Sequence, residues 1–298
     1  MAGALSSASV PAVGMSPSGV PPYSGYAPTQ QQQQSHENGV PPYSGYAFDL
    51  DGTIYLGEEL IDGAGGVIET LRSNGARVVF VTNKPLETSA EYATKLSKLG
   101  IPTVPADVIS AIDALVLYLT EHHPRGRILA VSEPVLVAEL RRAGFEVTED
   151  PTVTDVVVVS FDRTFDYGKL TRAYRAVGAG AVIVATNPDP YCPTPDGGLP
   201  DCAAMLAAIE ACTGTQAEAI VGKPSIYMAR AFLDRLGVPA SKAVMVGDRL
   251  LTDVAMGLEA GMASILVMSG ATTAQVLADS NVSPTYVLAS VRGLIHSP

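Results

Sequence analysis

Hydrophobic positions along the chain form short β-rich runs that alternate with longer segments of helical spacing. The first two runs, residues 46–50 and 78–82, end directly at polar residues, and each is followed by a stretch with the periodicity of a helix. Such alternation predicts a parallel sheet covered by helices on both faces. From residue 46 onward, the sequence therefore predicts an α/β fold.

The alternation occurs in two series, one of which interrupts the other. The predicted strands are 46–50, 78–82, 128–131, 155–160, 181–185, 243–246 and 264–267, and the predicted helices are 63–72, 87–99, 107–120, 134–143, 167–177, 226–236 and 253–260. We expect one discontinuous core domain, residues 44–123 and 218–298, with an inserted α/β cap domain at residues 124–217.

Residues 1–43 differ in composition from the rest of the chain. They are rich in Ser, Pro, Gly and Gln, and segments of this kind bury too little apolar surface to offset the entropy of ordering. We predict a disordered tail. A nine-residue stretch, GVPPYSGYA, occurs at residues 19–27 and again at 39–47, which indicates a short duplication leading into the first strand.

Composition and charge narrow the classes of function. The 298 residues are 47% hydrophobic, enough for a sizeable core, and the net charge of −11 with only 19 Lys and Arg argues against nucleic-acid binding. No apolar run reaches the roughly 18–20 residues of a membrane helix, and the first forty residues contain no Lys or Arg for a signal peptide. Three cysteines suit a reducing compartment. We expect a cytoplasmic protein without a membrane partner.

Polar residues follow several predicted strands at the point where each strand ends. Asp49 and Asp51 follow the first strand, Thr82 and Asn83 follow the second, and Asp248 follows a later one. In open parallel sheets, ligands bind beyond the carboxyl ends of the strands. Two further candidates are Lys223, between a glycine and a proline, and Asp253, five residues after Asp248.

These residue types in this order favour phosphoryl transfer. Asp49 and Asp51 would repel each other unless a cation intervenes, and Mg²⁺ suits an oxygen ligand set of the Asp49 and Asp248 carboxylates and the Asp51 carbonyl. Asp49 would attack phosphorus to form an aspartyl-phosphate, while the Asp51 side chain acts as acid and then base. Lys223 and Thr82 would neutralise phosphoryl charge.

Each member of this set, taken alone, also fits an ordinary structural role. The Asp-Leu-Asp-Gly-Thr stretch fits a turn, Thr82-Asn83 a helix cap, and Lys223 a solvated surface lysine. All of them follow successive strand-like runs in one order, and this order favours the functional interpretation. Within that interpretation, Asp253 is expected to orient Lys223 or metal-bound water without binding the metal itself.

The ordered set resembles the haloacid-dehalogenase superfamily of phosphatases, and the long insert is similar to that of the type IIA, NagD-like branch. The matching stretches are DGTIYLG at 51–57, ATNPD at 185–189, VGKPS at 221–225 and VGDRLLTD at 246–253. The resemblance implies a Rossmann-like core with a cap closing over the active site, and suggests a homodimer through the cap. It also implies site roles: Asp49 as nucleophile, Asp51 as acid/base, Thr82 and Lys223 as phosphate ligands and Asp248 as Mg²⁺ ligand.

Two departures from the family pattern bear on the substrate. Where relatives often carry a second Asn and a Ser after the Thr-Asn pair, this chain has Lys84-Pro85, which adds a cation beside the pocket. A cap loop that often carries a Trp-His pair has Tyr191-Cys192 instead. We therefore expect Asn83, Lys84, Tyr191 and Cys192 to contact the substrate or its phosphate.

The leading hypothesis is a Mg²⁺-dependent phosphatase for a small phosphomonoester, of the sugar phosphate, phosphoglycolate, nucleotide or pyridoxal phosphate class. Within the same fold, Asp51 disfavours a dehalogenase, and a carbon–phosphorus hydrolase would need a cap lysine, for which Lys169 is the main candidate. The alternative from another class is a non-catalytic module that senses or binds a phosphorylated ligand.

Overall fold

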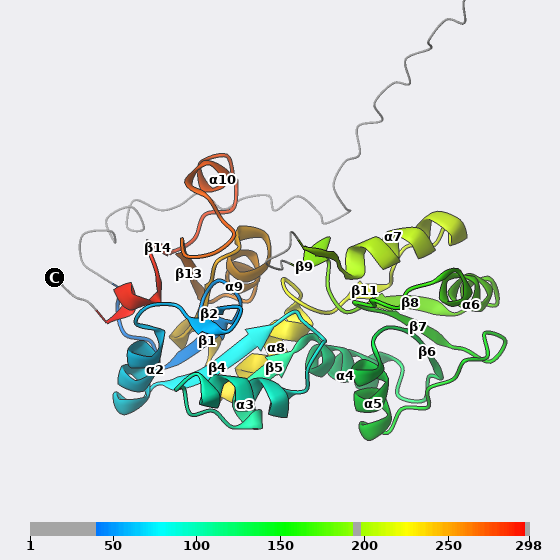
Figure 1. The fold of residues 1–298 in the computed structure, drawn as a ribbon, viewed down its shortest axis with the longest axis horizontal. Helices are drawn as coiled ribbons and strands as arrows, with labels where there is room; N and C mark the ends of the chain where they lie inside the picture. Colours follow the sequence, from blue (N-terminus) through cyan, green and yellow to red (C-terminus); the bar gives the residue numbers. More distant parts are fainter. Residues whose placement is uncertain (1–39, 193–197, 296–298) are drawn as a thin grey trace, which may run out of the picture.

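The computed structural model describes residues 40–192 and 198–295, and it confirms the predicted α/β fold. A six-stranded parallel sheet has the strand order β14-β13-β12-β1-β4-β5 (Figure 1). The sheet consists of β1 (Gly45–Asp49), β4 (Arg77–Thr82), β5 (Val108–Ser110), β12 (Ala243–Gly247), β13 (Ala263–Val267) and β14 (Tyr286–Leu288). β1 lies at its centre, between β12 and β4.

Helices cover both faces of this sheet because its strands are apolar on both sides. In β1, Ala47 packs into one hydrophobic cluster while Tyr46 and Phe48 pack into another on the opposite face. The Ala47 face is covered by α4 (Ala111–His122), α8 (Ile226–Leu236) and α9 (Ala255–Glu259), and the other face by α2 (Ala64–Ser73) and α3 (Ser89–Lys98).

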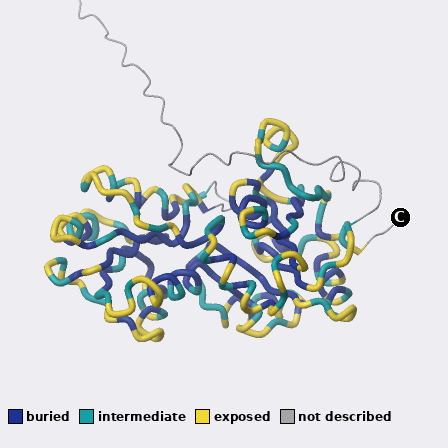
Figure 2. Tube along the Cα trace, turned by 180° about the vertical axis from the view of Figure 1, so that it is seen from behind, coloured by how far each residue is buried: buried dark blue, intermediate teal, exposed yellow. Residues whose placement is uncertain are grey.

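A second, four-stranded parallel sheet has the order β11-β8-β7-β6. Its strands are β6 (Ile128–Val131), β7 (Val156–Val159), β8 (Val182–Ala185) and β11 (Ala219–Ile220). One face packs against α6 (Tyr167–Gly178) and α7 (Cys202–Thr213), and the other against α5 (Pro134–Arg142). The cluster under α5 is continuous with the core under α4, so buried chain runs from one sheet into the other (Figure 2).

Two segments differ from the sequence prediction. Residues 107–110, predicted as the start of a helix, form the end of a 3-10 turn (Pro105–Asp107) and the edge strand β5. Ser110 ends this strand and caps α4, since its hydroxyl accepts a hydrogen bond from the Ile112 amide at 3.2 Å. The predicted helix 253–260 is α9 preceded by a π-helical turn (Leu250–Val254).

The short elements were not predicted from the sequence. They are β2 (Tyr55–Leu56) with β3 (Glu59–Leu60), β9 (Tyr191–Cys192) with β10 (Leu199–Pro200), α10 (Ala274–Ala278), the edge strand β14, and the 3-10 turns Ala240–Lys242 and Val291–Leu294. α7 and β11 were also unpredicted. Because β11 pairs with β8, we propose that the chain returns to the core after Ile220 rather than at the predicted residue 218.

The predicted tail lies outside the described residues, apart from its last four. Of these, Val40 and Tyr43 pack against the cluster around Phe48, so the packed part of the chain begins before the predicted boundary at residue 44. Among the helices of the described ranges, none combines the length and the apolarity required to cross a membrane.

Candidate active site

Three strands of the large sheet deliver polar side chains to one place. Asp49 is the last residue of β1, Thr82 the last of β4, and Asp248 follows β12 directly. Asp49, Thr82 and Asp248 are at most 8% exposed. Asp49 and Thr82 line a cavity that also receives residues from the segments after β8 and β11 of the smaller sheet. Its lining is Asp49, Asp51, Thr82, Asn83, Lys84, Asp189, Tyr191, Cys192, Asp201, Lys223, Arg249 and Thr252.

Two glycines let the loops approach the carboxylates closely. Gly52 has a φ of +85°, and a Cβ added there would lie 2.5 Å from Asp248 Oδ2. A Cβ on Gly247 would lie 2.3 Å from Asp253 Cγ. Both distances are far below van der Waals contact, so these two positions require glycine for the acidic residues to converge.

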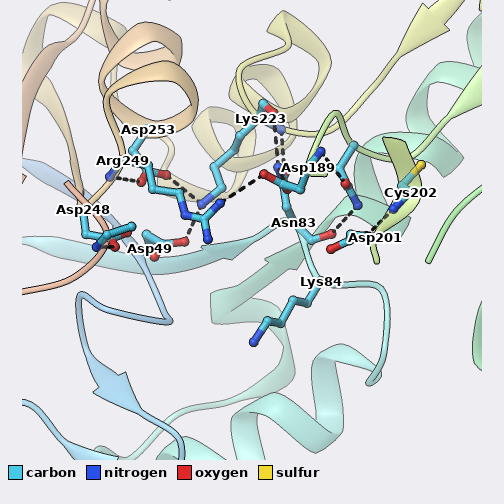
Figure 3. Close-up of polar contacts among 12 residues, drawn as sticks. Asp49, Asn83, Lys84, Asp189, Asp201, Cys202, Lys223, Asp248, Arg249 and Asp253 are labelled. Atoms are coloured by element: carbon cyan, nitrogen blue, oxygen red, sulfur yellow. Dashed lines mark hydrogen bonds and ion pairs between the residues drawn. The ribbon is translucent and has the colours of Figure 1, made fainter. Parts of the chain in front are cut away.

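Lys223 is the cation at the centre of the site. Its ammonium group contacts Asp49 Oδ1 and donates a hydrogen bond to Asp253 Oδ1 at 2.7 Å (Figure 3). Burial alone would lower the pKa of Lys223, but the charges of Asp253 and Asp49 outweigh it and raise the pKa. Lys223 is therefore positively charged, and it joins two acidic residues from different loops.

Asn83 fixes the backbone of Lys223. The Asn83 Oδ1 accepts a hydrogen bond from the Lys223 amide at 2.7 Å, and its Nδ2 donates to the Lys223 carbonyl at 3.2 Å and to Asp189 at 2.8 Å. Although Asn83 lines the cavity, both ends of its side chain are bound to protein groups. In this arrangement it positions Lys223 and Asp189.

Asp49, Asp248 and Asp253 form a compact acidic cluster, with one carboxylate oxygen of each within 4.8 Å of the others. Burial raises the pKa of Asp49 well above its usual value; Lys223 opposes the shift, and the neighbouring carboxylates add to it. Burial, followed by the charge of Asp253, raises the pKa of Asp248 to about 6. The cluster therefore holds more negative charge than Lys223 alone offsets.

The two outer acids of the cluster differ in their partners. Asp253 uses both oxygens, since Oδ1 faces Lys223 and Oδ2 accepts the Arg249 amide at 3.1 Å. Asp248 Oδ2 accepts the Ala271 amide at 2.5 Å, whereas its Oδ1 is buried without a hydrogen-bond partner in the described structure. Buried polar atoms normally have partners, so Asp248 Oδ1 is an acceptor that suits a cation.

Asp51 and Lys84 form an ion pair in the lining of the cavity. Lys84 Nζ lies 2.9 Å from Asp51 Oδ1, and both side chains are about a quarter exposed, at 23% and 27%. Burial would lower the pKa of Lys84, but the charge of Asp51 outweighs it and raises the pKa. The Lys84 amide donates to Thr82 Oγ1 at 3.1 Å.

A separate two-stranded sheet, which follows β8 in the chain, contributes both predicted cap residues to the cavity. Tyr191 and Cys192 form β9, which pairs with β10, and both line the cavity; Tyr191 is 52% exposed and Cys192 is 5% exposed. Burial raises the pKa of the Cys192 thiol, against the opposing charge of Lys84. The structure thus brings every predicted site residue to one cavity or to the acidic cluster beside it.

Four residues of the cavity were not predicted: Asp189, Asp201, Arg249 and Thr252. Asp189 and Arg249 lie in two of the stretches that carry the family resemblance, but the pattern itself gave them no role. Asp201 is the N-cap of α7, and an N-cap carboxylate looks the same in a sequence whether or not it also faces a cavity.

Comparison with known proteins gives consistent matches over most of the chain. The haloacid dehalogenase-like hydrolase family model matches residues 46–146, and a HAD-hydrolase-like model matches residues 220–294. The sugar-phosphatase AraL of Bacillus subtilis is 37% identical over 244 residues, which are 82% of this chain and 89% of AraL.

Two solved structures extend the comparison to the fold. The 4-nitrophenylphosphatase of Thermotoga maritima superposes with a TM-score of 0.80 at 33% identity, covering 85% of this chain and 96% of that one. NagD of Escherichia coli superposes with a TM-score of 0.77 at 28% identity, covering 84% and 98%. The chain therefore belongs to the haloacid-dehalogenase superfamily, as a phosphatase of its type IIA, NagD-like branch.

Proposed function

We propose that this phosphatase depends on Mg²⁺ and hydrolyses small phosphomonoesters through a phosphoryl group carried transiently on Asp49. The observation that carries the proposal is the position of Asp49. It ends β1, contacts Lys223, lies beside Asp248, and lines a cavity that also receives residues from the segments after β8 and β11. A nucleophile, a cation and a metal-binding acid are thus within reach of one phosphate.

The residues present fit a Mg²⁺ ion. Mg²⁺ binds carboxylate and carbonyl oxygens, and Asp248 Oδ1 is a buried acceptor without a partner in the described structure, beside Asp49. We assign Asp49 and Asp248 as the carboxylates that would hold the ion, with the Asp51 carbonyl as predicted from the sequence. When bound, the ion supplies positive charge to phosphoryl oxygens.

In the first step, a carboxylate oxygen of Asp49 attacks phosphorus, and the bond from phosphorus to the leaving oxygen breaks. The Asp51 carboxyl group donates its proton to that oxygen, so that the alcohol departs uncharged. Lys223 and the Thr82 hydroxyl donate hydrogen bonds to the phosphoryl oxygens during transfer, which stabilises the charge they carry.

In the second step, the roles of Asp51 reverse. Its carboxylate takes a proton from water, the water oxygen attacks phosphorus, and the bond between phosphorus and Asp49 breaks to release phosphate. Asp253 and Asn83 hold Lys223 in place through both steps, by way of its ammonium group and its backbone respectively. Neither residue needs to touch the substrate.

The substrate class proposed is a small sugar phosphate or a compound of similar size. Support comes from AraL, whose name describes a sugar phosphatase, and from the cavity lining, which includes the carboxylates of Asp189 and Asp201. We keep a cytoplasmic location and a homodimer through the cap within the proposal. Light scattering on the purified protein measures the oligomeric state.

The decisive experiment uses p-nitrophenyl phosphate with Mg²⁺ and the variant Asp51→Asn. The p-nitrophenolate ion leaves without protonation, so the first step survives loss of the acid, whereas attack by water on the phosphoryl group loses its base. We expect a rapid release of about one p-nitrophenol per active site, followed by slow turnover.

Mass spectrometry of the quenched Asp51→Asn variant should locate one added phosphoryl group on the peptide that contains Asp49. The double variant Asp49→Asn, Asp51→Asn is the control and should show neither the burst nor the modification. A burst that persists without Asp49 would disprove the covalent step. Undiminished wild-type activity after treatment with a chelator would remove Mg²⁺ from the proposal.

A further inference from the structure

We propose that Asp201 selects the substrate by the charge of its leaving group, accepting neutral groups that carry hydroxyls and rejecting groups that carry a second anion. This inference rests on the proposed phosphatase function and adds a specificity-determining residue to it. Asp201 comes from the smaller sheet's side of the cavity, at the N terminus of α7.

Asp201 lies at the end of the cavity away from the acidic cluster. It is 3% exposed and lines the cavity together with Tyr191 and Cys192. Figure 3 shows Asp201 on the far side of Asn83 from Asp49 and Lys223. A phosphate held at Asp49 would therefore direct its ester group toward Asp201.

The charge of Asp201 is not neutralised as the others are. The other carboxylates that line the cavity each pair with a cation: Asp49 with Lys223, Asp51 with Lys84 and Asp189 with Arg249. Within residues 40–192 and 198–295, no cation lies within ion-pair distance of Asp201. The charged groups that face it are Asp189, which adds negative charge, and Lys84, which is engaged by Asp51.

Asp201 also has hydrogen-bonding capacity to spare. Its Oδ1 accepts the Cys202 amide at 2.6 Å, and its carboxylate interacts with the Asn187 side chain. A carboxylate has about four acceptor positions, so room remains for hydroxyl donors. Burial raises the pKa of Asp201 to about 6, and the group is therefore ionised above neutral pH.

These properties give opposite results for two kinds of leaving group. A hydroxyl donates to a buried carboxylate at little cost, whereas a second carboxylate or phosphate would be placed beside an unpaired negative charge. The two classes can be compared with little change in size. Glycerol 3-phosphate and 3-phosphoglycerate differ only in whether the carbon far from phosphate is a hydroxymethyl group or a carboxylate.

The test measures how strongly each compound competes with hydrolysis of p-nitrophenyl phosphate at about pH 7.5, where Asp201 is ionised. With the wild-type protein, we expect glycerol 3-phosphate to inhibit at a concentration at least about tenfold lower than 3-phosphoglycerate. In Asp201→Asn that ratio should fall at least about fivefold, because the amide keeps the size and the capping oxygen but removes the charge.

Asp166→Asn is the matched control. Asp166 is the exposed N-cap of α6, accepting the Lys169 amide at 2.7 Å, and it does not line the cavity. Its amide variant should keep the wild-type ratio. If Asp201→Asn fails to fold, as judged by thermal unfolding, Asp201→Ser carries the test, since serine also caps helices.

The outcomes separate this inference from the proposed function. A wild-type ratio near one, no competition by glycerol 3-phosphate, or an unchanged ratio in Asp201→Asn would overturn the role of Asp201 while phosphatase activity remained. A uniform loss of affinity for all three compounds would mean that Asp201 is only a helix cap, which also overturns it. A wild-type protein that releases no phosphate at all from p-nitrophenyl phosphate would overturn the proposed function itself.

Discussion

The two parallel sheets both end in buried acids next to a lysine, but the two lysines are used differently. At the carboxyl end of the large sheet, Lys223 faces Asp49 and Asp253, and Asp248 adds a third acid. Beyond the carboxyl end of the smaller sheet, Lys169 faces Asp162 at 2.5 Å. In the first case one lysine pairs with two acids and a third acid lies beside them, whereas in the second one lysine pairs with one acid.

The smaller sheet satisfies its polar groups internally. The Lys169 ammonium group also donates to Thr164 Oγ1 at 2.7 Å and to the Ser132 carbonyl at 3.3 Å. By contrast, Asp248 Oδ1 at the large sheet has no partner in the described structure. Of these two strand-end sites, the one at the large sheet is therefore the one that leaves an acceptor unsatisfied, at Asp248.

The largest expected effect comes from exchanging one acid at each sheet. Asp49→Asn should lower kcat/KM for p-nitrophenyl phosphate by about a thousandfold or more, since the amide cannot serve as the nucleophile. Asp162→Asn should leave kcat/KM within about threefold of wild type. Steady-state kinetics with both variants measures the contrast, and a similar loss in the two would remove it.

The next largest effect is the loss of stability expected when either lysine is replaced. Lys223→Met and Lys169→Met each leave buried carboxylates without a cation, and removing one partner of a buried pair costs about 3–5 kcal/mol of unfolding free energy. The Lys223 side chain is 4% exposed and the Lys169 side chain is 18% exposed, so the loss should be the larger in Lys223→Met. Urea unfolding should therefore show destabilisation in both variants.

The two lysine variants should differ in catalytic activity even though both are destabilised. Lys223→Met should lose about a hundredfold or more in kcat, because a phosphoryl ligand is gone, whereas Lys169→Met should retain nearly all of its activity per folded molecule. Loss of catalysis by folded Lys169→Met would mean that the smaller sheet takes part in the chemistry and that the contrast between the sheets is false.

The sequence predicted the large sheet and its polar edge for a physical reason. Asp49, Thr82 and Asp248 lie at the ends of three buried strand patterns of the predicted core, and parallel strands place such ends on one edge. The edge strand β5 was not predicted, because three buried residues directly before a helix have no period of their own. The local hydrophobic pattern predicted an element correctly where that element was long and flanked by polar residues.

Asp189 and Asp201, which come from the chain after β8, were not predicted for a different reason. Asp189 and Asp201 reach the cavity only because Asn83 and Arg249 of the large sheet meet the loop after β8. That approach depends on how the two sheets pack, which no spacing along the chain encodes. Asp201 in particular is a helix cap by sequence and a cavity residue only in three dimensions.

Mg²⁺ should stabilise the protein by binding at the large sheet and not at the smaller one. Mg²⁺ added to about a hundred times its dissociation constant should stabilise the wild-type protein by about 3 kcal/mol, seen as a rise in Tm. Asp248→Asn should lose most of that rise, since it removes a carboxylate from the cluster. Asp162→Asn should keep it, and an equal loss in both variants would show that the ion does not bind at the large sheet.

The smallest effect concerns Asp201, which comes from the smaller sheet's side and resembles Asp248 in having no cation within ion-pair distance in the described structure. Burial raises its pKa from 3.8 to about 6, so the folded protein binds a proton more tightly than the unfolded chain does. Wild-type stability should accordingly fall as pH rises through the interval between these two values. Above it, the buried charge remains as a cost.

Asp201→Asn removes that cost. The variant should exceed the wild type in unfolding free energy by on the order of 2 kcal/mol at about pH 7.5, and the gain should vanish near pH 4, where the wild-type group is largely protonated in the folded state. Asp166→Asn, which removes a charge from an exposed helix N terminus, should instead lose a few tenths of a kcal/mol at about pH 7.5. Thermal or urea unfolding at the two pH values measures both differences. A destabilised Asp201→Asn at the higher pH would mean that the carboxylate is compensated after all, and would align Asp201 with Asp162 rather than with Asp248.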